Sequence, residues 1–325
     1  MRGQAPAWLP GGHLQTIWAA RVARAEDGPP VAWRRERWNT PDADFVDVDW
    51  VDAPKPDAPT VVLFHGLEGS RHSHYARAFA CVARARGWRL ALPHFRGCSG
   101  EINLAPRAYH SGDSAEIEFL LQKVAERVAG PRYAVGVSLG GNALMRWAGE
   151  QGAAASQRVR AVASICAPLD LLASGRQLGQ GFNLRVYTPM FLQTMKRKAR
   201  QKWEQFPELF DLPRALAARD LWEFDDAFTA PVHGYRGVED YWTRASAKPL
   251  LPQIQLPALL LNARNDPFIP ASSLPQAYEV GPQTVCWQPD WGGHVGFAQG
   301  PFPGQVLGLP QDILDWLDQT GGAHG

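Results

Sequence analysis

The chain has 325 residues, with 33 Lys and Arg against 32 Asp and Glu, so its formal net charge at pH 7 is +1. A charge this close to zero provides no global field for capturing DNA or RNA, and we expect no nucleic-acid partner. Hydrophobic residues make up 45% of the chain and 13 residues are tryptophan, which excludes disorder over most of its length.

The first predicted elements are two strands. Residues 45–51 alternate acids with Val46, Val48 and Trp50, a period of two that predicts a strand with one solvent-exposed face. Residues 60–64 form a short apolar run, which is typical of a strand buried on both faces. We predict that residues 1–40 are an N-terminal extension packed on a single domain that spans 1–325.

Helices and strands then alternate along the chain. In order, they are a helix at 75–86, a strand at 88–93, a helix capped by Ser111 or Asp113, a strand at 133–137, a helix at 142–148 and a strand at 159–165. Alternation at this spacing predicts an α/β fold, with a mostly parallel twisted sheet flanked by helices.

This alternation stops between residues 172 and 248, where helix formers and aromatic residues dominate. We interpret the segment as a helical cap inserted between two strands. Its basic run, Lys196 to Lys202, favours a solvated helix face; alternating with aromatic residues, it could also give weak peripheral contact with an anionic lipid surface. Strands at 258–261 and 284–287 and a helix at 313–317 complete the pattern.

The cysteines and the N-terminus indicate in which cellular compartment the protein is expected and whether it is expected to bind a metal or cofactor. The four cysteines lie far apart and form no C-x-x-C pair, so they fit neither a zinc knuckle nor a disulfide scaffold; they are Cys81, Cys98, Cys166 and Cys286. No signal-peptide pattern opens the chain, and no stretch approaches the roughly 18 apolar residues of a membrane span. We expect a cytoplasmic protein with no metal and no cofactor.

The strongest chemical signal is Gly136-Val137-Ser138-Leu139-Gly140, the one G-x-S-x-G sequence in the chain. It lies where a buried strand gives way to a helix. A nucleophilic serine must stand on such a tight turn so that its hydroxyl clears the sheet, and glycines on both sides allow the backbone to approach closely. The same turn places the backbone N–H of Leu139 where it can stabilise an oxyanion.

A serine nucleophile requires a base and an orienting acid, expected downstream in the order acid, then histidine. The downstream histidines are His233 in the insertion, His294 in a glycine-rich turn and His324 near the C-terminus. We favour His294 because its turn follows a predicted strand.

For the acid we favour Asp266, which directly follows the strand at 258–261. The alternatives are Asp290, four residues before His294, and Asp170, just beyond the strand at 159–165. Asp290 lies on the same connection as His294, so its carboxylate would have to reach back to orient Nδ1 of His294, which is geometrically awkward.

The loop after the strand at 60–64 is expected to supply the second oxyanion donor, the backbone N–H of Leu67. We expect His65 to pack at the strand end without titrating in the reaction. The pair His72 and His74 has no accompanying ligand cluster, which favours a loop or helix-start role over a metal site.

Several motifs together resemble the YheT-like branch of the α/β-hydrolases, and they cover almost the whole chain. They are residues 8–16, 65–70, 94–101, 109–113, 136–142, 262–267 and 292–296. The resemblance implies a Ser138–Asp266–His294 triad, a carboxylesterase or lipase-like activity and a helical cap over the site. The H-x-x-x-x-D acyltransferase signature of some relatives is missing, since no histidine here has Asp five positions on.

We therefore expect a serine hydrolase that cleaves carboxylic esters, acting on a small-molecule or lipid ester through an acyl-serine intermediate. One alternative is an ester synthase that passes the acyl group to an alcohol. Another is a non-catalytic binding module on a hydrolase fold.

Overall fold

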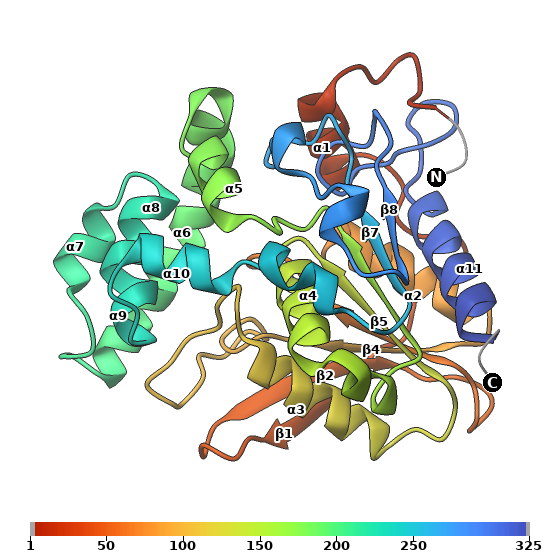
Figure 1. Cartoon of the computed structure of the whole chain (residues 1–325), viewed down its shortest axis with the longest axis horizontal. Helices are drawn as coiled ribbons and strands as arrows, with labels where there is room; N and C mark the ends of the chain where they lie inside the picture. Colours follow the sequence, from red (N-terminus) through yellow and green to blue (C-terminus); the bar gives the residue numbers. More distant parts are fainter. Residues whose placement is uncertain (1–3, 323–325) are drawn as a thin grey trace.

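The structure, a computed structural model, describes residues 4–322 and is built on one eight-stranded sheet with the order β1-β2-β4-β3-β5-β6-β7-β8 (Figure 1). The strands from β4 to β8 in this order run parallel, and β1 and β2 add antiparallel pairs at one edge. Their bounds are β1 Arg34–Asn39, β2 Phe45–Val51, β3 Thr60–Phe64, β4 Arg89–Pro93, β5 Arg132–Val137, β6 Ala161–Ile165, β7 Ala258–Leu261 and β8 Thr284–Trp287. The mostly parallel α/β sheet predicted from the sequence is confirmed.

Helices cover both faces of the sheet. One apolar cluster joins the sheet to α3 (Ser114–Ala125) and α4 (Leu139–Gln151), and a second joins it to α2 (His74–Ala85) and α11 (Gly308–Gly322). Successive side chains of β3 alternate between the two layers, because neighbouring residues of a strand point to opposite faces. Phe64 belongs to the first cluster and Leu63 to the second, and both are fully buried.

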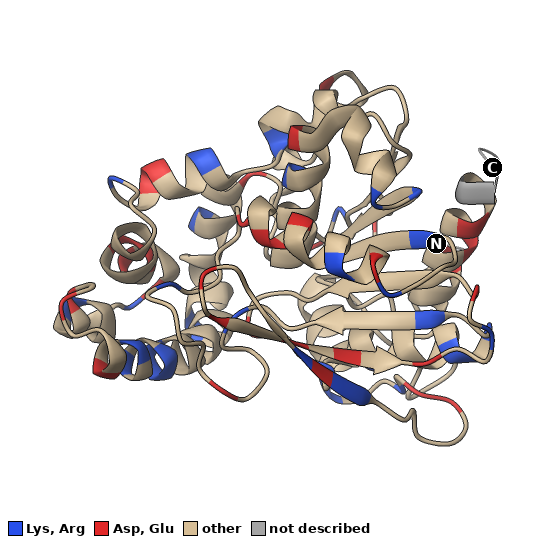
Figure 2. Cartoon of the chain, turned by 90° about the horizontal axis from the view of Figure 1, so that it is seen from below, with Lys and Arg blue, Asp and Glu red and all other residues tan. Residues whose placement is uncertain are grey.

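The prediction that β2 has a solvent-exposed face is wrong. Asp47 and Asp49 are buried, because β1 lies beside β2 and places an arginine opposite each acid. Arg35 makes two hydrogen bonds to Asp49, at 2.7 and 2.8 Å, and Arg37 binds Asp47 in the same way. Figure 2 shows basic and acidic residues side by side along this edge of the sheet. Bidentate pairing of this kind offsets the desolvation of a buried carboxylate.

The predicted N-terminal extension, 1–40, therefore includes an edge strand, β1, that the sequence did not reveal. Five of its six side chains are polar, so it lacks the apolar pattern of a strand. The same segment also contains α1 (Gly12–Arg21). Residues 1–3 of the predicted extension lie outside the described part of the chain.

The segment predicted as a helical cap lies between β6 and β7 and is helical throughout its regular structure. It contains α5 Leu171–Leu178, α6 Gly181–Gln205, α7 Leu212–Ala217, α8 Leu221–Phe224, α9 Ala230–Val232 and α10 Val238–Ala245. Most of these helices lie beside the sheet and share an apolar cluster of their own (Figure 1). Across residues 4–322, no helix is both long and apolar enough to cross a membrane.

Candidate active site

Ser138 occupies the turn between β5 and α4, with the left-handed backbone angles φ 52° and ψ −121°. A non-glycine residue in this region is strained and persists only where its surroundings hold it. The turn also needs the flanking glycines. A Cβ on Gly136 would lie 2.4 Å from the carbonyl oxygen of Gly140, and one on Gly140 would lie 2.5 Å from that of His65.

Two loops at the carboxyl edge of the sheet bring an imidazole and a carboxylate to this serine. The Ser138 hydroxyl lies 3.0 Å from Nε2 of His294, and Nδ1 of His294 lies 2.8 Å from Oδ2 of Asp266. The other Asp266 oxygen accepts the backbone N–H of Phe268 at 2.8 Å, which fixes the carboxylate. This arrangement has the donor and acceptor order in which a serine hydroxyl can pass its proton to an imidazole.

The rival acids lie elsewhere. The side chain of Asp290 is 95% exposed and lies 3.7 Å from Arg264, whereas Asp170 caps α5 by accepting the N–H of Ala173. Neither carboxylate is the hydrogen-bond partner of His294.

The rival histidines do not take the place of His294 either. The ring of His233 lies in the cap with its centroid 4.4 Å from that of His110, and burial lowers the pKa of His233 to about 3. His324 lies outside the described residues.

The loop after β3 passes directly beside Ser138. A Cβ on Gly66 would lie 3.1 Å from the Cβ of Ser138, so there is little room for a side chain at Gly66. Leu67 lines the same cavity as Ser138 and Leu139. His65 is fully buried and accepts the N–H of Phe95 at 3.1 Å. Burial lowers the pKa of His65 to about 3, so this side chain is neutral and packs at the strand end.

Among the described residues, Cys166, Asp266 and His294 form one group with ligand atoms close enough for a metal ion, within 4.8 Å of one another. Their polar atoms already bond locally. Asp266 is bonded to His294, and Cys166 accepts the N–H of Val295 at 3.3 Å. Burial also raises the pKa of the Cys166 thiol, which opposes the thiolate that metals prefer.

The paired histidines, His72 and His74, point to different partners. The Nε2 atom of His74 hydrogen-bonds the carbonyl oxygen of Val295 at 2.9 Å, whereas His72 is exposed and lies 3.4 Å from Arg71. This separation agrees with the loop or helix-start interpretation.

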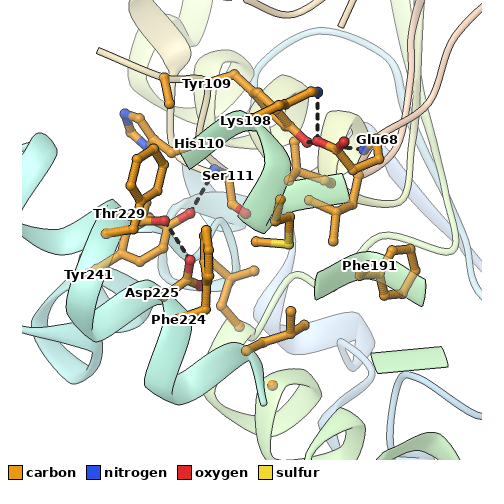
Figure 3. A pocket seen from close by; sticks show the side chains of 18 of the residues that line it. Glu68, Tyr109, His110, Ser111, Phe191, Lys198, Phe224, Asp225, Thr229 and Tyr241 are labelled. Atoms are coloured by element: carbon orange, nitrogen blue, oxygen red, sulfur yellow. Dashed lines mark hydrogen bonds and ion pairs between the residues drawn. The ribbon is translucent and has the colours of Figure 1, made fainter. Parts of the chain in front are cut away.

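A cavity opens above Ser138 between the sheet and the cap, with about 1050 Å³ of space including its mouth. Most side chains that line it are apolar, and Figure 3 shows aromatic side chains around it. The cap contributes Leu178, Phe191, Met195, Leu221, Phe224 and Phe228. An apolar wall of this kind suits the hydrocarbon part of a ligand.

The prediction that the basic run Lys196 to Lys202 is a solvated helix face is wrong for two of its members. Lys202 is 1% exposed and donates to the carbonyl oxygens of Asn103 and Ala105 at 2.8 and 2.9 Å. Lys198 lines the cavity and forms an ion pair with Glu68. Both lysines occupy the inward face of α6, because their spacing of four residues puts them on one side of the helix.

Sequence reasoning assigned no role to Gln15 or Thr16 and placed Lys198 on a solvated helix face, whereas all three contact loops of the site. For the first two, the one available signal was their place in the motif at residues 8–16.

Comparison with known proteins shows which family the chain resembles. Residues 59–301 match a family model described as alpha/beta hydrolase fold. The chain is 36% identical over 310 residues to "Putative esterase YheT" of Escherichia coli (strain K12), covering 94% of this chain and 89% of that protein. It is 30% identical over 286 residues to "Phospholipase ABHD3" of Mus musculus, covering 85% and 69%.

Solved structures agree on the fold. Alpha/beta hydrolase domain-containing protein 10 from mouse superposes with a TM-score of 0.57 at 14% identity, over 88% of this chain and 99% of that one. A similarity at this level of identity concerns the architecture of the fold.

Proposed function

Because the chain belongs to the alpha/beta hydrolase family, and within it to the YheT-like branch, we propose that it cleaves carboxylic esters through an acyl-serine intermediate. The observation that carries the proposal is the continuous hydrogen-bond chain from Ser138 through His294 to Asp266. The names of the two relatives, an esterase and a phospholipase, are consistent with an ester substrate.

In the first half-reaction, His294 accepts the Ser138 proton on Nε2 while Oγ attacks the ester carbonyl carbon. The carbonyl oxygen gains the negative charge, which the backbone N–H groups of Leu67 and Leu139 stabilise. Asp266 stabilises the imidazolium that forms. His294 then gives the proton to the departing alcohol, and the acyl group remains on Ser138.

In the second half-reaction, water loses a proton to His294 and attacks the acyl carbon. The carboxylic acid leaves, and the proton returns to Ser138. We propose water as the acceptor; product analysis with added ethanol separates hydrolysis from acyl transfer, since a transferase would form the ethyl ester.

The cavity supports an apolar acyl group as the part of the substrate that it holds. Small esters and lipid esters share this chemistry. Arg197 and Arg200 remain exposed on α6, and we propose that any weak contact of the cap with an anionic lipid surface uses them. Esters graded from acetate to dodecanoate, assayed with and without anionic vesicles, distinguish the two substrate types.

The decisive experiment compares Ser138→Ala with Ser174→Ala. Both serines line the cavity, but only Ser138 contacts His294. We expect Ser138→Ala to lose about 10⁴-fold or more in kcat on p-nitrophenyl butyrate and all labelling by a fluorophosphonate probe. Ser174→Ala should keep both. Full turnover by Ser138→Ala would show that the proposed nucleophile is wrong.

A further inference from the structure

Thr16, on α1, bonds directly to the backbone of the proposed base. Its Oγ1 accepts the N–H of His294 at 2.8 Å and donates to the carbonyl oxygen of Gly12 at 2.7 Å. Thr16 is buried, and 278 residues separate it from His294 in the sequence. The hydroxyl therefore ties the loop of the base to a helix that precedes the first strand of the sheet.

Gln15 makes the equivalent connection one residue earlier. Its Oε1 accepts two donors, the N–H of Gly292 at 2.8 Å and the side-chain amide of Asn265 at 2.9 Å. Its own amide donates to the carbonyl oxygen of Leu9 at 3.0 Å, and the side chain is 3% exposed. One buried oxygen thus joins the loop that carries the acid to the loop that carries the base.

A third bond closes this arrangement between the two loops themselves. The N–H of Gly293 donates to Oδ1 of Asn265 at 2.9 Å. Asn265 directly precedes Asp266, and Gly293 directly precedes His294. These bonds therefore hold the residues directly before Asp266 and His294, the two side chains whose separation must be maintained.

The packing of α1 against the two loops leaves no room for a side chain at Gly12 or at Gly293. A Cβ on Gly12 would lie 1.9 Å from the carbonyl oxygen of Asn265. A Cβ on Gly293 would lie 2.6 Å from the carbonyl oxygen of Gly12 and 2.7 Å from Oγ1 of Thr16. Such close approach of backbones is possible only at glycine.

The base loop needs external support because its own backbone is irregular. Gly292, Gly293, Val295 and Phe297 all have positive φ, and two of these residues are not glycine. Positive φ at a non-glycine residue persists only when surrounding contacts enforce it. Contacts from α1 are among those that hold this loop.

We propose that α1 is a clamp on the catalytic loops, in which Thr16 and Gln15 are positioning residues that keep His294 aligned between Ser138 and Asp266. The clamp rests on the proposed function, since it acts through His294. The clamp gives a role to the motif at residues 8–16, which takes part neither in the proposed chemical steps nor in the sheet.

The test uses Thr16→Val, which keeps the shape of the side chain and removes the acceptor for His294. We expect kcat for p-nitrophenyl butyrate to fall about 10- to 100-fold with KM within about twofold, because a displaced base impairs the chemical step and leaves the apolar cavity intact. Thr16→Ser restores the hydroxyl and should recover most of kcat. Thr60→Val is the matched control and should leave kcat unchanged. Thr60 is also a buried threonine, and it lies at the start of β3, at the end of the strand away from the loop that carries Leu67.

Gln15→Met provides a second, independent variant and is decisive if Thr16→Val fails to fold. It should lower kcat and the rate of fluorophosphonate labelling in parallel, while circular dichroism shows a folded protein. Unchanged kcat in a folded Thr16→Val or Gln15→Met protein would overturn the clamp. Such a result leaves the proposed function standing as long as Ser138→Ala is inactive, whereas activity in Ser138→Ala would overturn the function itself.

Discussion

The ammonium group of Lys198 lies 2.8 Å from Oε1 of Glu68, and this ion pair joins the longest cap helix, α6, to the loop that leaves β3 (Figure 3). Tyr109 donates its hydroxyl to the same Glu68 oxygen at 2.6 Å and accepts the Glu68 N–H at 3.0 Å. Glu68 has a φ of 56° and directly follows Leu67, the proposed oxyanion donor. Lys198 of the cap thus contacts the side chain of the residue that directly follows that donor, and Tyr109 holds both this side chain and its backbone N–H.

Replacing Lys198 by methionine should destabilise the protein and slow the reaction. The side chains of Lys198 and Glu68 are only 16% and 11% exposed, so the variant leaves a mostly buried carboxylate without its counter-charge. We expect a loss of about 2–4 kcal/mol in urea unfolding and a lower kcat. The double variant Lys198→Met/Glu68→Gln should regain part of this stability, since it removes the unpaired charge.

Arg197→Met is the control for this pair, because Arg197 is exposed on the same helix. Its unfolding free energy and kcat should match those of the unmodified protein. Equal effects of Arg197→Met and Lys198→Met would show that the ion pair is not responsible.

Replacing the proposed acid should affect activity far more than replacing its rival. Asp266→Asn keeps the shape of the side chain but removes the charge that orients and stabilises the His294 imidazolium, so we expect kcat to fall about 10⁴-fold. Asp290→Asn, at a side chain that is 95% exposed, should stay within about twofold of the original. Steady-state kinetics on p-nitrophenyl butyrate decide between them, and the reverse order of effects would assign the acid to Asp290.

A methyl group at position 66 should disturb the nucleophile. The Cβ of Gly66→Ala would lie 3.1 Å from the Cβ of Ser138 and 3.7 Å from its Oγ, so one of the two backbones must move by a few tenths of an ångström. We expect roughly a tenfold loss in kcat and in fluorophosphonate labelling.

Gly179→Ala is the matched control for this change. The nearest atom to its new Cβ lies 3.5 Å away, and the backbone φ of −78° suits alanine. Full activity of Gly66→Ala would show that the loop can yield without moving Ser138.

Asp225 should make the stability of the protein depend on pH. It lies in the cavity wall with its oxygens bonded to Thr229 and Trp242, and burial raises its pKa to about 6 (Figure 3). The unfolded chain loses this proton at lower pH than the folded chain does. Ionisation of folded Asp225 therefore opposes folding, and its contribution to the unfolding free energy falls as pH rises from about 4 to about 6.

The variant Asp225→Asn removes this titration. Its unfolding free energy minus that of the unmodified protein should increase by roughly 2–3 kcal/mol between about pH 4 and about pH 7. Urea unfolding at several pH values measures the difference, with the exposed Asp290→Asn as the control. A difference that is the same at every pH would show that the carboxyl group of Asp225 is not desolvated.

Most of the sheet could be predicted from the sequence because its parallel strands are continuous apolar runs, such as residues 60–64, that no other structure would bury as well. The turn at Ser138 was recognisable because the constraint is local. A strand, a strained residue and a helix succeed one another within a few positions, and glycine is needed on both sides. The strand β1 was missed because its arginines resemble a surface segment until the acids of β2 are placed opposite them.

The sequence by itself determined the order of the parallel strands and of the helices between them, the turn that carries Ser138, and the short set of residues from which an acid and a base could come. Local backbone preferences and the burial of apolar runs act over a few residues and can be read without coordinates. Only the tertiary structure decided that Asp266 rather than Asp290 faces His294, that Lys198 and Lys202 point inward, and that Gln15 and Thr16 hold loops more than 240 positions away. Those relationships depend on hydrogen-bond geometry of a few ångströms between distant segments, which exists only after the chain has packed.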